Sequence, residues 1–313
     1  DANDDKIRIL NRTVQWTDAG IIFESDPRHA EIVCKQLFSD EKGSYPDGST
    51  KRSCSVKAVS TPGTKDKPEG PEVPLSGSQA SQYRSLVMRI NYLARDRSDL
   101  QFAGKELARK MCEPTSHDWQ KLKRLGRYLI GVPRLELFFR FQKFVGDLNC
   151  YVDSDYAGCL RTRKSTNGGC MMHGSHCIKS WSTNQSVIAI SSGEAEFYAL
   201  VKGSSELLGM LSIGVDLNRS LTGHLHSDSS AAIGMSHRRG LGKVKHLHTQ
   251  FLWVQERVRS GDFVVHKERT DRNRADLMTK NLARPAIDKF VTMIGYRIPT
   301  QANSLAFRSA CQL

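Results

Sequence analysis

The sequence predicts an α/β fold in the second half of the chain, preceded by a mostly helical segment. From residue 147 onward, apolar runs of strand length alternate with helical patterns, in the order of three strands, helix, strand, helix, strand and helix. Residues 82–141 instead repeat apolar side chains at spacings of three and four, which indicates helices. Residues 39–81 are rich in Ser, Gly, Lys, Pro and Asp with little periodicity, which is typical of a linker.

Length and charge narrow the classes of function. At 313 residues the chain is long enough for two or three modest domains. Its net charge of +13 and pI near 9.4 favour an anionic partner, and nucleic acid more than an anionic membrane. No apolar run approaches the roughly 18 residues that a bilayer crossing needs, so we expect no membrane partner. The acidic start of the sequence does not resemble a signal peptide.

The cysteines indicate a reducing compartment. The sequence has 8 Cys without a Cys-x-x-Cys pair, and most of them lie among apolar residues, so we expect free thiols and an intracellular location. Four neighbouring residues have the chemistry of zinc ligands: Cys170, His173, His176 and Cys177. Because His176 and Cys177 are adjacent on a predicted hairpin, their side chains point to opposite faces, and we expect no structural zinc.

The first third of the chain begins with strands. Residues 6–24 predict a hairpin that turns at Asp18-Ala19-Gly20, and Asp26-Pro27 then opens a helix. A later helix begins near Thr115-Ser116, where either hydroxyl is a suitable cap. That helix has a basic face, which fits either a solvated surface or a track for phosphates: Lys121, Lys123, Arg124 and Arg127.

The α/β part divides into strands and helices of ordinary length. Its helix over 192–214 follows the capping box Ser191-Ser192-Gly193-Glu194. The other expected elements are strands at 150–153, 168–173, 177–181, 224–227 and 262–266, helices at 229–235 and 244–258, and a last helix from Ala275.

Four acids stand at the ends of these elements. Asp153 closes the first strand, Asp228 follows a later one, and Asp276 opens the last predicted helix. On the helix after residue 191, Glu194 and Glu196 point about 200° apart, and the cap accounts for Glu194. Each acid has an ordinary alternative as a turn former, a helix cap or a dipole partner. Together they predict an oxygen-ligand site for Mg²⁺, with two ions about 4 Å apart activating a water for phosphodiester hydrolysis.

Nine short stretches carry a family resemblance. In chain order they are Tyr83-Arg84-Ser85-Leu86-Val87, Tyr92-Leu93-Ala94, 152–158, Arg163-Lys164-Ser165-Thr166, Ser180-Trp181-Ser182, 191–197, 230–233, Lys245-His246 and 275–280. The chain thereby resembles the C-terminal part of a copia-type retrotransposon Pol polyprotein. The resemblance implies residues 1–80 as a reverse transcriptase tail and linker, 81–146 as a helical thumb or connection segment, 147–283 as a ribonuclease H domain and 284–313 as a tail.

The resemblance implies a ribonuclease H-like fold, a five-stranded mixed sheet flanked by helices. It also implies Mg²⁺-dependent cleavage of the RNA strand of RNA–DNA hybrids, with Mn²⁺ as an alternative ion. The implied catalytic and metal-binding residues are Asp153, Glu196, Asp228 and Asp276. The implied partner is the polymerase domain of the same polyprotein, in a cytoplasmic particle or the nucleus. The aromatic-x-Asp-Asp signature of the polymerase is absent from the sequence, so we expect no polymerase activity.

Further residues are assigned less directly. Arg161, Arg163, Lys164 and Ser192 are candidates for contacts to phosphates and to RNA 2′-hydroxyls. His266 precedes Asp276 by ten positions and is either a structural histidine at a strand end or, as in related ribonucleases H, an aid to product release.

Two alternatives stay open. The first is a catalytically inactive, nucleic-acid-binding or structural relic of the same polyprotein. The second, a transposase or integrase on a related fold, is disfavoured because Glu196 lies on the first helix of the α/β part.

Overall fold

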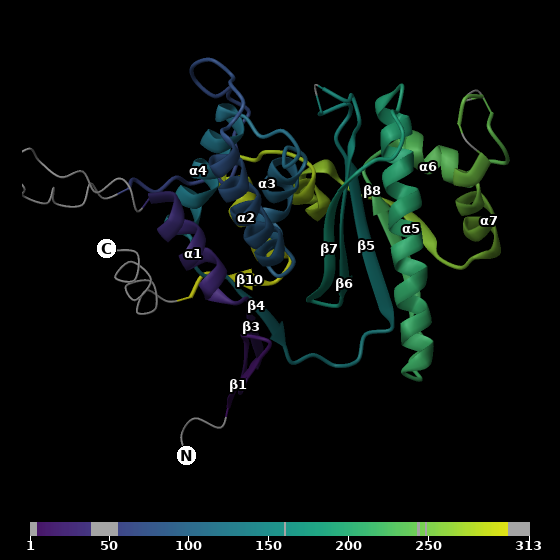
Figure 1. The fold of residues 1–313 in the computed structure, drawn as a ribbon. Helices are drawn as coiled ribbons and strands as arrows, with labels where there is room; N and C mark the ends of the chain where they lie inside the picture. The colour runs from purple at the N-terminus through teal and green to yellow at the C-terminus, as the bar shows by residue number, and fades with distance from the viewer. Residues whose placement is uncertain (1–4, 39–55, 160, 243–244, 248, 300–313) are drawn as a thin grey trace, which may run out of the picture. The chain divides into compact units, whose positions relative to one another are not determined.

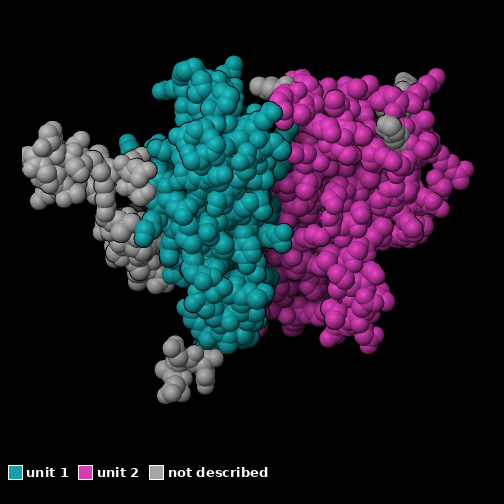
Figure 2. Space-filling view, in the orientation of Figure 1, with its two compact units in different colours: residues 1–139, 281–292, 296–313 teal, residues 140–280, 293–295 magenta. Residues whose placement is uncertain are grey.

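A computed structural model of the chain describes residues 5–38, 56–159, 161–242, 245–247 and 249–299. The chain forms two compact units (Figure 2). Unit 1 comprises residues 1–139, 281–292 and 296–313, and unit 2 comprises residues 140–280 and 293–295. The four-part division that the family resemblance implies stays a prediction. Among the described residues, no helix has both the length and the apolar character that a membrane crossing requires.

Unit 1 contains a five-stranded sheet in the order β1-β2-β3-β4-β10, in which β1, β2 and β3 are antiparallel neighbours and β4 is antiparallel to β10. Its strands are β1 (Lys6–Ile9), β2 (Arg12–Thr17), β3 (Gly20–Glu24), β4 (Glu136–Arg140) and β10 (Tyr296–Arg297). Thr17 pairs with Gly20, which confirms the predicted turn. A further turn at Leu10 and Asn11, with φ angles of 50° and 63°, divides the first arm of the predicted hairpin into the two paired strands β1 and β2.

Four helices of unit 1 share one apolar core: α1 (Pro27–Phe38), α2 (Gly77–Ala94), α3 (Ser98–Ala108) and α4 (Ser116–Gly131). A fifth helix of the chain, α8, spans Arg284–Met293. Thr115 and Asp118 form a reciprocal capping box at the start of α4, so Thr115 is the cap. The apolar stripe of α1, with Val33 fully buried, packs into the same core as α2, α3 and α4.

A fully buried ion pair lies inside this helical core. Arg97, with 0% of its side chain exposed, donates two hydrogen bonds to Asp99 at 2.9 and 2.7 Å. The hydroxyl of Tyr128 donates to the same carboxylate at 2.8 Å, and Arg97 also reaches the carbonyl of Val132 at 3.1 Å. Burial alone would lower the pKa of Arg97, but Asp99 raises it, so the guanidinium stays charged.

Unit 2 is built on a five-stranded mixed sheet in the order β7-β6-β5-β8-β9 (Figure 1). The strands are β5 (Asp147–Ser154), β6 (Thr166–His173), β7 (His176–Asn184), β8 (Thr222–Ser227) and β9 (Val264–Lys267). Strands β5, β6 and β7 are antiparallel neighbours, whereas β5, β8 and β9 run parallel. This strand order, with a helix between β7 and β8, is the ribonuclease H-like arrangement, and the predicted fold is confirmed.

Helices cover the sheet because each carries an apolar face. Helix α5 (Ser192–Asp216) packs on β5 and β8, and its buried Phe197 and Leu207 share a core with Val152 and Leu225 of the sheet. The helices α6 (Ser230–His237) and α7 (Trp253–Ser260) lie between β8 and β9 in the chain. Short 3₁₀ turns complete the unit: η2 (Thr249–Phe251), η3 (Thr270–Arg272) and η4 (Arg274–Met278).

Two of the predicted helices are wrong. The long helix expected over 244–258 is α-helical only from Trp253, after the short 3₁₀ turn η2, and Lys245 to Leu247 form turns and a bend. The reason is tertiary: Leu247 is buried in the core of unit 2, and His246 contacts Glu194. The helix expected from Ala275 is instead the 3₁₀ turn η4, and α8 begins only at Arg284.

Candidate active site

Strand β5 delivers Asp153 into the interior of unit 2. Because side chains alternate along the strand, Val152 packs against α5 and Asp153 points to the other face of the sheet. Asp153 is only 2% exposed. The hydroxyl of Thr279, itself fully buried, donates to Oδ2 of Asp153. The orientation of the Asp153 carboxylate is therefore fixed by Thr279, a residue 126 positions later in the sequence.

The first turn of α5 presents two glutamates with different surroundings. The hydroxyl of Ser191 accepts from the backbone N–H of Glu194 at 3.2 Å, so Ser191 is the cap as predicted, but the second half of the predicted capping box is replaced by a bond from Ile190 N–H to Glu194. The Glu194 carboxylate accepts from Ile190 N–H at 3.0 Å and from the Tyr198 hydroxyl at 2.6 Å, and lies 2.8 Å from His246 Nε2. Glu194 is thus fully engaged locally.

Glu196 has far fewer partners. Its Oε2 atom is buried and has no hydrogen-bond donor among the described residues. Burial, together with the charges of Asp153 and Asp228, raises the pKa of Glu196 to about 9. An ionised carboxylate that is buried without a hydrogen-bond donor destabilises the folded state unless a cation binds to it.

Carboxylates of three elements converge at this point. Asp153 from β5, Glu196 from α5 and Asp228 after β8 each offer an oxygen, and these oxygens lie within 4.8 Å of one another. Asp228 does not cap α6, because the cap is Ser229, whose hydroxyl accepts from Ala232 N–H at 3.2 Å. The alternative role of Asp228 as a helix cap is therefore excluded.

The fourth predicted acid lies beside this group and forms an ion pair with Lys280, although its buried Oδ1 atom has no hydrogen-bond donor among the described residues. Asp276 lies within η4 and is 7% exposed. The cap of η4 is Asn273, whose side chain accepts from Ala275 N–H and donates to Val152 O at 2.9 Å. Burial and the charge of Asp153 raise the pKa of Asp276 to about 7. Lys280 Nζ lies 2.8 Å from Asp276 Oδ1.

The three converging acids fit a divalent cation. Hard cations such as Mg²⁺ and Mn²⁺ take oxygen ligands, and a few carboxylates with waters suffice for Mg²⁺. Asp153, Glu196 and Asp228 supply these oxygens from three different elements. The buried Oε2 of Glu196 has no hydrogen-bond partner among the described residues, and a bound ion would supply one.

The metal-free chain is expected to lose stability as the pH rises from about 5 to about 9. The pKa of Glu196 is about 9 in the folded chain against an ordinary 4.5, so the folded state binds this proton more tightly than the unfolded state. The stabilisation is therefore present at low pH and is lost between these two values. We expect a decrease in the free energy of unfolding of at least about 1.4 kcal/mol, which corresponds to one pKa unit.

Urea denaturation with chelator at about pH 5.5 and 8.5 measures this loss. Because other groups titrate in both variants, the difference between the wild-type chain and Glu196→Gln isolates the contribution of Glu196. The substitution should reduce the pH dependence, leaving the part contributed by groups such as Asp276, and equal slopes in the two variants would contradict the assignment.

The residues predicted to contact nucleic acid lie in the β5–β6 connection and at the start of α5. Arg161 and Arg163 are exposed and Lys164 is half-buried in the β5–β6 connection, where Arg163 has a φ of 56°. Ser192 is the exposed first residue of α5. Their contact to substrate stays a prediction.

His266 lies within β9 and joins a group of aromatic side chains. Its Nε2 is 2.9 Å from His224 Nδ1, and its ring stacks on His226, which in turn stacks on Tyr151. Burial and His224 lower the pKa of His266. This packing fits the structural interpretation of His266, and its role in product release stays a prediction.

Three residues at the site were missed from the sequence. Thr279 and Lys280 contact the acids directly, and His246 holds Glu194. The spacing of four between Asp276 and Lys280 is the signal that was available, since such pairs meet on one side of a helical turn.

Comparison with known proteins shows where the chain belongs. No family model matches the sequence. The retrovirus-related Pol polyproteins from transposons RE2 and RE1 of Arabidopsis thaliana are each 32% identical to it, over 218 residues (69% of this chain) and 223 residues (70%) respectively. The solved LC11-RNase H1, isolated from compost, is 17% identical and aligns over 46% of this chain and 98% of its own, with a TM-score of 0.31.

The chain spans about 15% of the length of the two Pol polyproteins. The aligned part includes more than two thirds of this chain, whose unit 2 has the ribonuclease H-like strand order. The chain therefore belongs to the family of the retrovirus-related Pol polyproteins of copia-type transposons.

Proposed function

We propose that the chain is a divalent-metal-dependent ribonuclease that hydrolyses the RNA strand of RNA–DNA hybrids. The observation that supports this best is the convergence of Asp153, Glu196 and Asp228 within 4.8 Å on a ribonuclease H-like sheet. Three neighbouring carboxylates destabilise the metal-free protein, which indicates a cation site. A basic protein with a divalent-cation site is suited to a phosphodiester substrate.

Each acid has a defined part in this proposal. Asp153, Glu196 and Asp228 hold the ion, and the buried hydroxyl of Thr279 keeps Asp153 from turning away. When bound, Mg²⁺ lowers the pKa of a water and neutralises charge on the scissile phosphate. Ser154 supplies a backbone hydrogen bond that stabilises the Glu196 carboxylate.

The substrate is proposed from chemistry at the edge of the site. Only RNA carries the 2′-hydroxyl, so selection of the RNA strand requires a donor or acceptor at that group. Ser192 is exposed at the N-terminus of α5 and offers both a hydroxyl and a backbone N–H. Arg161, Arg163 and Lys164 are proposed to contact phosphates and to fix the register of the duplex.

The partner proteins follow from the family. Because the chain spans about 15% of the relatives, we propose that it acts together with the polymerase part of the same polyprotein. The product of reverse transcription is an RNA–DNA hybrid, which is the substrate proposed for unit 2. A cytoplasmic particle or the nucleus is the proposed place of action.

A cleavage assay with three labelled duplexes tests the proposal. The full chain is incubated with RNA–DNA hybrid, double-stranded RNA and double-stranded DNA of one sequence, with Mg²⁺, Mn²⁺ or chelator. We expect cleavage of the RNA strand of the hybrid alone, and none with chelator. Salt-sensitive binding of the hybrid without cleavage in either metal would instead identify an inactive, nucleic-acid-binding relic.

A further inference from the structure

Three histidines lie on one face of the sheet of unit 2. They come from the neighbouring parallel strands β8 and β9, where His226 pairs with His266. Leu225 and Val265, which precede these two residues, are buried in the core that the sheet shares with α5. Because side chains alternate along a strand, His224, His226 and His266 all point to the face opposite this core.

Two of these histidines contact each other directly. Nδ1 of His224 lies 2.9 Å from Nε2 of His266, and Nε2 of His224 lies 3.3 Å from Oδ1 of Asp147 on β5. An ionised carboxylate only accepts hydrogen bonds, so the neutral His224 ring carries its proton on Nε2. Its Nδ1 therefore presents a lone pair toward His266.

The third histidine restricts the orientation of the pair. Nε2 of His226 lies 2.9 Å from Oδ1 of Asn149, and its ring stacks on that of His266 with a centroid distance of 5.1 Å and an interplanar angle of 22°. Asp147 thus orients His224, and His226 orients His266. Histidine ligands of bound metals are oriented by such neighbours, most often by a carboxylate on the second ring nitrogen.

The spacing of the pair suits a metal ion. Zn–N bonds are about 2.0–2.1 Å long, so two nitrogens on one ion lie about 2.9–3.4 Å apart for angles between a right angle and the tetrahedral angle. The 2.9 Å between His224 and His266 falls at the lower end of this range, so binding requires the rings to turn but not the strands to move. The His266 proton then moves from Nε2 to Nδ1, and both facing nitrogens donate lone pairs.

The ligand type and the exposure define which ion can bind. Imidazole nitrogens suit Zn²⁺, Cu²⁺ and Ni²⁺, whereas Mg²⁺ takes oxygen ligands. The side chains of His224 and Asp147 are 22% and 58% exposed, so an ion can reach the pair from solvent and retain water in its other positions. Strand β9 is the last in the sheet order, so such an ion would link an edge strand to its neighbour β8.

We propose that His224 and His266 bind one transition-metal cation of the Zn²⁺ class, with Asp147 as the positioning residue that orients His224. The ion links β9 to β8 and stabilises unit 2. This site is independent of the proposed ribonuclease activity, because its ligands are nitrogens that belong to none of the three acids. It departs from the expectation of no structural zinc, which was drawn from residues of β6 and β7.

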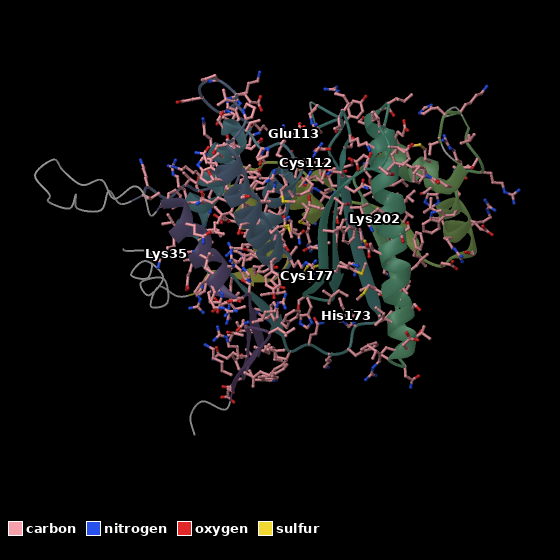
Figure 3. All side chains as sticks on the ribbon, in the orientation of Figure 1. Lys35, Cys112, Glu113, His173, Cys177 and Lys202 are labelled. Carbon is pink, nitrogen blue, oxygen red and sulfur yellow. The ribbon has the colours of Figure 1, made fainter. Side chains whose placement is uncertain are left out.

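Electron paramagnetic resonance of bound Cu²⁺ tests the identity of the ligands. One equivalent of Cu²⁺ is added to the full metal-free chain in a large excess of Mg²⁺, which occupies oxygen-ligand sites. We expect hyperfine splitting from two imidazole nitrogens in the wild-type chain and its loss in His224→Gln and in His266→Gln. His173→Gln is the matched control and should keep the signal. His173 (Figure 3) is another half-buried histidine of the same sheet, but its Nε2 faces the carbonyl of Val145 at 2.7 Å.

Titration with Zn²⁺ in the same buffer tests the role of Asp147. Asp147→Asn should weaken Zn²⁺ binding by about 10–100-fold, the usual effect of removing the carboxylate behind a histidine ligand. Zn²⁺ should also raise the thermal unfolding midpoint of the wild-type chain and of His173→Gln more than that of His266→Gln, because the ion binds only the folded pair.

A wild-type spectrum without nitrogen splitting would overturn the site, and so would splitting that persists in both glutamine variants at β8 and β9. Wild-type Zn²⁺ affinity in Asp147→Asn would overturn the positioning role. If one glutamine variant does not fold, the other variant and the wild-type spectrum decide. None of these measurements involves cleavage, so their failure leaves the proposed ribonuclease intact, and failure of the hybrid-cleavage assay leaves this site intact.

Discussion

Replacing Asp153 with Asn is expected to lower the rate of hybrid cleavage by roughly 10²–10³-fold, the loss typical of removing one preorganised electrostatic group. Asp153 takes part in several contacts at the site: its carboxylate converges with Glu196 and Asp228, accepts a hydrogen bond from Thr279 and lies 3.6 Å from Lys280 Nζ. The amide keeps the shape of the side chain but removes the charge that holds a cation. Single-turnover cleavage of a labelled hybrid at saturating Mg²⁺ measures the loss.

The design of this experiment separates loss of chemistry from loss of folding. Asp228→Asn should cause a similar decrease, and the double variant should lose little more than either single one, because the acids act as a unit. Asp262→Asn is the control, since the Asp262 side chain forms a surface pair with Arg257 at 3.0 Å. Near wild-type cleavage by Asp153→Asn would refute the assignment of the catalytic centre.

The largest effect on stability is expected at the buried pair of unit 1. Arg97→Met should lower the free energy of unfolding by about 3–5 kcal/mol, because removing one member of a buried ion pair leaves the other charge uncompensated. Both side chains, Arg97 and Asp99, are 0% exposed, and the Tyr128 hydroxyl would be the remaining donor to Asp99. Urea denaturation followed by circular dichroism measures the change.

Two comparisons show whether burial is the cause. The double variant Arg97→Met/Asp99→Leu should recover part of the lost stability, since a well-packed apolar pair often replaces a buried ion pair at little cost. Arg109→Met removes a more exposed pair with Glu106, at 3.0 Å, and should cost at most about 1 kcal/mol. Equal losses for Arg97→Met and Arg109→Met would contradict this explanation.

The sequence by itself determined the order of most elements of this protein. The alternation around Val152 and the cap at Ser191 are local signals, and the strand and the helix that they predict are present in the structure. Asp153, Glu196 and Asp228 stood out for the same reason, because a charge at the end of an apolar strand or in a first helical turn is visible in the sequence alone.

Only the tertiary structure decided which groups meet. Contacts between residues far apart in the chain, such as Thr279 with Asp153 or His246 with Glu194, leave no periodic signal in the sequence. They also override local preference, as at Leu247, where burial in the core replaces the predicted helix with a bend. The free energy of such contacts depends on the folded neighbourhood, so the sequence identified the acids but not the lysine that accompanies them.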